Sequence, residues 1–194
     1  GFAVLQVNFR GSTGYGSDYK TAGYRQWGKK MQTDLVDALK WVKASGQADA
    51  DNACIVGASY GGYAALVAGY QTPERFKCII SIAGISDLEI QVREFKSQGY
   101  DEYAKNAVAD DPKEMRKLSP VDYAAKFKAP VLLIHGKVDT VVRYEQSEYM
   151  FDALEDAGKS VEYELFDYGT HHLDDAANRK KAMVLMADFL AKHL

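Results

Sequence analysis

Cysteine is scarce in this chain, which holds only Cys54 and Cys78 among its 194 residues. No Cys-x-x-Cys pair occurs, so the usual sequence signs of a structural metal site or a redox centre are missing. Each cysteine lies within an apolar run typical of a β-strand, where cysteine usually serves as a small buried hydrophobic residue. We therefore expect two core cysteines, no metal site and no cofactor. The pair indicates neither a reducing nor an oxidising compartment.

Basic and apolar runs are also short. The chain carries 24 Lys and Arg against 27 Asp and Glu, a formal net charge of −3, and no basic run is interleaved with aromatic residues. We therefore expect no nucleic-acid partner. No apolar run approaches the roughly 18 residues of a spanning helix, so we expect no membrane span in this segment. A hydrophobic content of 47% fits a single domain that covers residues 1–194.

The first residues contain neither an initiator Met nor a charged and apolar leader, because Gly1 opens directly into an apolar, strand-like run. We interpret the chain as part of a longer protein whose earlier residues would carry any signal peptide. The sequence therefore leaves the localisation of the protein open.

Short apolar runs alternate with longer helical patterns along the chain. Strands are predicted near residues 2–9, 53–57, 77–82, 130–135 and 160–166, and helices near 31–44, 60–71, 144–157 and 175–192. This alternation is typical of an open α/β fold, in which helices cover both faces of a mostly parallel sheet. Residues 86–126 are polar and weakly periodic, and we interpret them as an excursion that shapes a substrate pocket.

A glycine-flanked serine follows the second of these strands. The segment reads Gly57-Ala-Ser59-Tyr60-Gly61, between an apolar strand and a helix of small residues. This pattern is typical of a nucleophile elbow, a tight strand-to-helix turn that raises a serine hydroxyl above the carboxyl edge of a sheet. The backbone N–H of Tyr60 would then point at an oxyanion formed at Ser59. Alternatively Ser59 only caps a helix, but the flanking strand and helix favour the elbow.

A serine nucleophile needs a histidine to accept its proton and a carboxylate to orient that histidine. In folds with this elbow the order along the chain is serine, acid, histidine. His193 is next to last in the chain, at the end of the final predicted helix, and His135 ends a strand, where it would anchor a turn. The pair His171 and His172, after the last strand, is therefore left as the candidate base. Asp139 is the only carboxylate in the loop that follows the preceding strand.

A second glycine-rich stretch, residues 10–16, follows the first predicted strand. It does not end in Gly-Lys-Ser/Thr, and no helix opens at once after it, so a phosphate-binding loop is not indicated. We interpret it as a structural turn beneath the active site.

Several motifs together resemble the catalytic domain of the prolyl oligopeptidase family of serine peptidases, which includes dipeptidyl peptidases and acylaminoacyl-peptidases. They are Val7-Asn-Phe-Arg-Gly-Ser-Thr-Gly-Tyr-Gly16, Trp27-Gly28 with Asp34, Gly57-Ala-Ser59-Tyr-Gly-Gly-Tyr63, His135-Gly-Lys-Val-Asp139, and His171-His172-Leu173 followed by Asn178-Arg179. The resemblance spans nearly the whole chain. It implies an α/β-hydrolase fold without its first strands, with Ser59 as the nucleophile and Asp139 as the acid. It implies His171 as the base, because this loop commonly reads His-x-Leu in the family, with His172 as the alternative.

The same resemblance implies a function, which is cleavage of peptide bonds in short peptides through an acyl-enzyme. It further implies an N-terminal β-propeller of the same parent chain, absent here, that restricts entry to the site. The second oxyanion donor would lie upstream of Gly1, which would leave the isolated chain inactive. By resemblance to the dipeptidyl peptidases, Tyr60, Ile85 and Val142 would line the pocket beside the scissile bond.

Two other functions are compatible with the sequence. A carboxylesterase-like hydrolase would use the same three residues, because such a triad cleaves esters readily. A catalytically inactive interaction domain would keep only the fold, although every triad position here is chemically competent.

Overall fold

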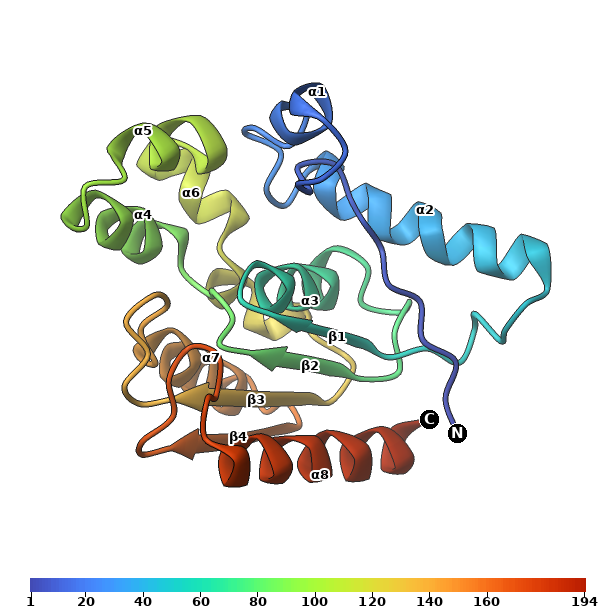
Figure 1. Cartoon of the computed structure of the whole chain (residues 1–194). Coiled ribbons are helices and arrows are strands. Elements are labelled where there is room, and N and C mark those ends of the chain that lie inside the picture. The colour runs from blue at the N-terminus through green and yellow to red at the C-terminus, as the bar shows by residue number, and fades with distance from the viewer.

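The structure, a computed structural model, describes residues 1–194 and is built on one parallel sheet of four strands. The strands pair in their order along the chain and are β1 (Ile55–Ala58), β2 (Ile79–Ile82), β3 (Val131–Gly136) and β4 (Val161–Phe166). All pairings are parallel, so the four carboxyl ends meet at one edge of the sheet, on the left in Figure 1. Four of the five predicted strands are therefore confirmed.

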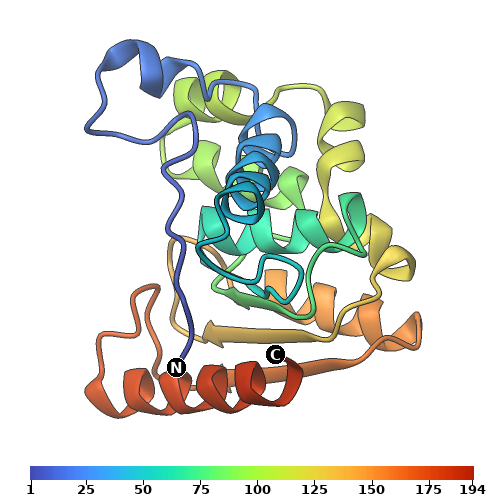
Figure 2. The ribbon, with the colours of Figure 1, turned by 90° about the vertical axis from the view of Figure 1, so that its right-hand side faces the viewer.

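Helices cover both faces of this sheet. One face carries α8 (Ala176–His193), whereas α3 (Tyr60–Gln71) and α7 (Glu145–Asp156) cover the other, with α2 (Lys30–Ser45) outside α3 (Figures 1 and 2). These four helices confirm the predicted ones, and a short helix, α1 (Ser17–Thr21), was not predicted. None of the helices has the length and apolar content that crossing a bilayer requires.

Local signals set the ends of these helices. The side chain of Asp175 accepts a hydrogen bond from the N–H of Asn178 and so caps the start of α8. At the C-terminal end of α2, Gly46 has a φ of 67°, the left-handed conformation in which helices commonly end. Gly158 has the same φ just after α7.

β2 and β3 are buried on both faces, which explains why their sequences read as continuous apolar runs, whereas β1 at the edge of the sheet leaves Val56 46% exposed. Side chains alternate between two hydrophobic clusters. Ile79, Val131 and Leu133 belong to the larger cluster, beneath α3 and α7. Ile80 and Leu132 belong to the smaller cluster, beneath α8. This alternation with a period of two fixes the register of the sheet between its helical layers.

The predicted excursion between β2 and β3 consists of short helices, most of which stand beyond the carboxyl edge of the sheet, while the last returns alongside α3 and α7 (Figure 1). They are α4 (Leu88–Ser97), α5 (Asp101–Tyr103), the π-helix η1 (Ala104–Val108), α6 (Pro112–Leu118) and the 3₁₀-helix η2 (Pro120–Lys126). Asp87 caps α4, and Asp111 caps α6, which starts with Pro112. Proline is well placed there because the first N–H of a helix has no intrahelical acceptor.

The strand predicted over residues 2–9 is wrong, because this segment pairs with no strand. β1 pairs only with β2, and its other edge does not pair with the segment, which therefore forms no ladder of backbone hydrogen bonds. Val4 remains 90% exposed, although Phe9 packs against the larger cluster. The apolar pattern was real, but a strand also needs a partner.

The prediction of two simple core cysteines is also incomplete, because Cys54 and Cys78 form a disulfide. Parallel pairing of Ile55 with Ile79 places the two preceding residues side by side, with their Cα atoms 4.6 Å apart. The bond joins the amino ends of β1 and β2, at the edge opposite Ser59. Its two cysteines are distant in sequence, and only the strand register brings them together.

Gly69 allows α3 to pack against the excursion, and its substitution tests this packing. A Cβ at Gly69 would lie 2.2 Å from the ring of Phe127, which is fully buried. We expect Gly69→Ala to lower the free energy of unfolding by about 1–3 kcal/mol, measured by urea denaturation. Gly61→Ala, in the same helix but with open space at its Cβ, is the matched control and is expected to be neutral or slightly stabilising. Equal stability of the two variants would contradict the packing argument.

Candidate active site

Ser59 lies in the tight turn between β1 and α3. Its backbone has a φ of 56° and a ψ of −121°, a combination that costs a residue with a side chain about 1–3 kcal/mol. Two hydrogen bonds hold the turn: the N–H of Ser59 donates to the Ile82 carbonyl at 2.8 Å, and the N–H of Tyr63 donates to the Ser59 carbonyl at 3.1 Å. The serine is thereby fixed at the carboxyl edge of the sheet.

Glycines make this turn sterically possible. A Cβ on Gly57 would lie 2.1 Å from the carbonyl oxygen of Gly61, so the strand and the helix could not approach as they do. A Cβ on Gly62 would lie 2.7 Å from the Cα of Gly84, in the loop after β2. Both contacts are far shorter than real Cβ atoms make, so each of these positions requires glycine.

Tyr60 follows the serine and opens α3. The first N–H groups of a helix have no intrahelical acceptor and lie at the positive end of the helix dipole, so the N–H of Tyr60 can donate to an anion near Ser59. Its ring packs against Phe9 and Trp27, at centroid distances of 5.1 and 4.6 Å. Burial raises the pKa of the Tyr60 hydroxyl, which has no hydrogen-bond partner.

Asp139 and His171 meet at the same edge of the sheet. Asp139 lies in the loop after β3, and His171 lies in the loop after β4 that rises at this edge (Figure 1). His171 Nδ1 is 2.7 Å from Asp139 Oδ2, and the aspartate side chain is fully buried. A carboxylate only accepts, so Nδ1 carries the proton and Nε2 presents a lone pair. His172 is exposed and its ring stands edge-on to that of His171.

The loop around Asp139 keeps its carboxyl group ionised. Burial raises the pKa of Asp139, but hydrogen bonds from His135, His171 and the N–H groups of Val142 and Val141 outweigh burial and place the pKa well below its usual range. The carboxylate is therefore negative at neutral pH and stabilises a proton on Nδ1 of His171.

The predictions from the sequence did not assign His135 to this site. It is fully buried at the end of β3, and its Nε2 lies 3.3 Å from Asp139 Oδ2 and 2.9 Å from the Val142 carbonyl. The spacing of four residues between His135 and Asp139 was the available signal. Spacing alone, however, does not tell whether a strand-end histidine points inward.

Two glutamines, one in α4 and one just after its last residue, also reach the loop that carries Asp139. Gln91 donates to the Val141 carbonyl at 3.2 Å, and Gln98 donates to the Thr140 carbonyl at 3.0 Å. The excursion is thus tied to the loop of the acid. Nothing in the sequence distinguishes these glutamines from ordinary surface residues.

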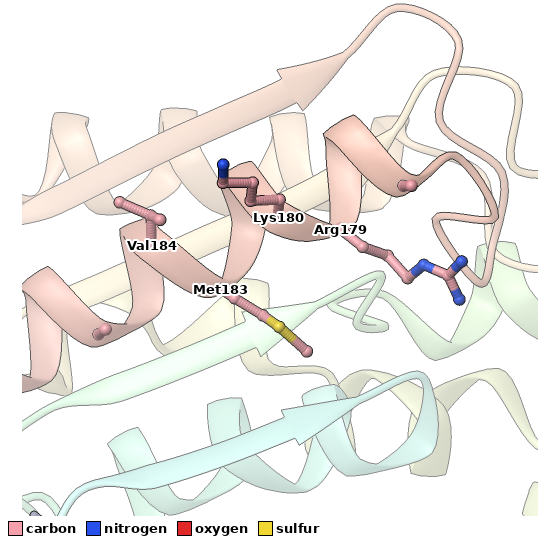
Figure 3. Close-up of a pocket in the computed structure, with 6 residues that line it drawn as sticks. Arg179, Lys180, Met183 and Val184 are labelled. Atoms are coloured by element: carbon pink, nitrogen blue, oxygen red, sulfur yellow. The ribbon is translucent and has the colours of Figure 1, made fainter.

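The predicted pocket residues Ile85 and Val142 are 2% and 1% exposed and belong to the larger hydrophobic cluster. Their role beside a scissile bond stays a prediction. A hollow of about 530 Å³ lies elsewhere, along the outer surface of α8, where Arg179, Met183 and Val184 contribute to its lining (Figure 3). A single helix surface without a nucleophile has no evident part in chemistry at Ser59.

Taken together, the carboxyl edge offers a serine hydroxyl, an imidazole oriented by a buried carboxylate, and a helix N-terminus. This set of groups can activate a serine as a nucleophile and stabilise an oxyanion. No group of three or more His, Cys, Asp or Glu side chains is arranged to hold a metal ion.

Comparisons with known proteins show the family to which this chain belongs. The whole chain, residues 1–194, matches the model of the prolyl oligopeptidase family. It is 35% identical over 203 residues to dipeptidyl aminopeptidase BIII of Pseudoxanthomonas mexicana, covering 100% of this chain and 29% of that protein. It is 28% identical over 203 residues to the acylamino-acid-releasing enzyme of Homo sapiens, covering 100% of this chain and 28% of that enzyme. The chain thus spans less than a third of the length of these relatives.

Solved structures agree with this result. An acylaminoacyl peptidase of Pyrococcus horikoshii superposes with a TM-score of 0.88 at 31% identity, over 96% of this chain and 31% of that chain. A puromycin-hydrolyzing peptidase of Mycobacterium tuberculosis gives a TM-score of 0.89 at 31% identity, over 96% of this chain and 29% of that chain. The predicted α/β-hydrolase fold is confirmed.

The backbone strain at Ser59 can be measured by substitution. Glycine adopts the observed φ and ψ without steric cost, whereas alanine keeps the strain and removes only the hydroxyl. We expect Ser59→Gly to be more stable than the control Ser59→Ala, with a free energy of unfolding about 1 kcal/mol higher. The relief of backbone strain exceeds the stability lost because glycine adds entropy to the unfolded chain. Urea denaturation of both variants measures the difference. A less stable glycine variant would mean that the turn is not strained.

The low pKa of Asp139 predicts how stability depends on pH. A carboxyl group whose pKa is lower in the folded state stabilises the fold fully above its ordinary pKa of about 3.9, and this contribution is lost as the pH falls toward the folded pKa. We therefore expect the stability difference between the unmodified chain and Asp139→Asn to be largest at pH 5–7 and to shrink below about pH 4. Urea denaturation across this range measures it. A difference that does not change with pH would argue against the lowered pKa.

Proposed function

Because this chain belongs to the prolyl oligopeptidase family, we propose that it is the catalytic domain of a serine peptidase that cleaves peptide bonds of short peptides. The observation that carries this proposal is the 2.7 Å contact between His171 Nδ1 and Asp139 Oδ2 at the edge where Ser59 stands. An inactive interaction domain would have no need for a buried carboxylate that orients a histidine at the same edge of the sheet as a strained serine.

In the proposed mechanism, Ser59 Oγ attacks the carbonyl carbon of the scissile bond while His171 Nε2 accepts the hydroxyl proton. The Asp139 carboxylate holds the other ring proton on Nδ1 and stabilises the imidazolium that forms. The N–H of Tyr60 donates to the oxyanion of the tetrahedral intermediate. His171 then gives its proton to the leaving amine, which leaves an acyl-enzyme on Ser59. A water molecule, deprotonated by His171, hydrolyses this ester.

We further propose that residues 1–194 act as one domain within a longer polypeptide that includes an N-terminal β-propeller, with peptides as the substrates. The support is that the named peptidases are more than three times as long as the stretch that this chain matches. In that arrangement the propeller would restrict access to the carboxyl edge of the sheet, and short peptides would be selected by size.

Labelling with a fluorophosphonate probe tests the proposed triad, because the probe reacts only with an activated serine. We expect the longer protein to be labelled, Ser59→Ala to abolish labelling, and His171→Ala to slow it by roughly a thousandfold or more. His172→Ala is the matched control, because it removes the neighbouring imidazole, and it should label within a few-fold of the unmodified protein.

Substrate class is measured in the same preparation. A peptide anilide should be hydrolysed with a higher kcat/KM than a short-chain ester, and the reverse order would favour a carboxylesterase. Absence of labelling in a folded, full-length protein would contradict the hydrolase assignment and favour an interaction domain.

A further inference from the structure

The ring of His135 is enclosed, and both of its nitrogens have partners. Nδ1 lies 2.7 Å from the hydroxyl oxygen of Ser147 in α7, and Nε2 faces Asp139 and the Val142 carbonyl. His135 has no exposed surface and Ser147 is 2% exposed. Water therefore does not compete for these contacts, and the protein alone determines where the proton of the ring resides.

The partners define the tautomer of His135. The Val142 carbonyl, 2.9 Å away, only accepts, so Nε2 carries the proton. The Ser147 hydroxyl can donate to the lone pair on Nδ1. A neutral ring protonated at Nε2 thus satisfies every partner at once. Asp139 Oδ2 lies 3.3 Å from the same nitrogen, so a second acceptor stands close to this N–H.

The Asp139 carboxylate, which this N–H faces, accepts hydrogen bonds on both of its oxygens. Oδ1 accepts from the N–H groups of Val141 and Val142, at 2.8 and 2.9 Å. Oδ2 accepts from His171 at 2.7 Å and faces His135 Nε2 at 3.3 Å. With donors on both oxygens, the carboxylate cannot rotate about its bond to Cβ without losing a hydrogen bond in a buried site.

We propose that His135 is a positioning residue, whose Nε2–H holds the Asp139 carboxylate toward His171 while its bond to the Val142 carbonyl closes the loop that carries the acid. This inference rests on the proposed function. His135 acts through Asp139: it is fully buried, so it touches neither substrate nor solvent. Ser147 acts through His135, because its hydroxyl donates to Nδ1 and so keeps the ring proton on Nε2.

Two amide substitutions separate the roles of the two ring nitrogens. Glutamine places an amide N–H near the position of Nε2 and can still donate toward Asp139. Asparagine is shorter, so its amide reaches the position of Nδ1 and can meet only Ser147. His135→Gln and His135→Asn therefore differ in whether the side chain at position 135 can donate a hydrogen bond toward Asp139. His193→Asn, in the last turn of α8, is the control for loss of a histidine elsewhere.

Steady-state kinetics with a peptide anilide, on the longer protein, test the proposal. Active sites are counted by fluorophosphonate titration, so that kcat refers to folded enzyme only. We expect His135→Asn to lower kcat by about 10- to 100-fold, a usual cost when a group that orients a functional residue is lost. KM should stay nearly unchanged, because no substrate contact is removed. His135→Gln should recover most of kcat, and His193→Asn should match the unmodified protein.

Ser147→Ala provides a milder variant in case His135→Asn does not fold. It should also lower kcat at constant KM, by less than His135→Asn. The positioning role is overturned if asparagine and glutamine at position 135 give equal kcat per active site, or if neither they nor Ser147→Ala change kcat. Failure of the proposed function looks different: activity or labelling would then persist in Ser59→Ala, whatever the His135 variants do.

Discussion

The strained turn at Ser59 is the constraint on which the rest of the site depends. A serine at a φ of 56° is tolerated only because β1 and α3 are anchored on both sides of it. The Ile82 carbonyl holds its N–H, and glycines at positions 57 and 62 let the adjacent backbone pass. The parallel sheet then places Asp139 and His171 at the same edge, because the loops that follow β3 and β4 both start there.

The acid loop is fixed from several directions. The end of β3 contributes His135 beneath Asp139, and α7 holds that histidine through Ser147. The backbone of the loop itself donates two N–H groups to the carboxylate. Of the three candidate catalytic side chains, the carboxylate is therefore the one with the most complete set of hydrogen bonds. This accounts for its low pKa in a buried position.

The sequence predicted the features that depend on local pattern. Glycine spacing around Ser59, four of the strands and the main helices follow from periodicity and turn chemistry, and the order of serine, acid and histidine singled out Asp139 and His171 as the acid and one of two candidate bases. What it missed depends on neighbours in space. The segment 2–9 has a strand pattern but no partner, and Cys54 meets Cys78 only through the strand register.

The amide contacts from α4 join the excursion to the acid loop. Gln91 in α4 and Gln98, the residue just after its end, donate to the carbonyls of two successive residues of that loop. The excursion also begins at Ser86, which is held by Gln146 of α7. A displacement of α4 away from the sheet would have to break both glutamine contacts or carry Thr140 and Val141 with it. The excursion and the loop of the acid are therefore coupled mechanically, and a movement of α4 would be transmitted to the backbone next to Asp139.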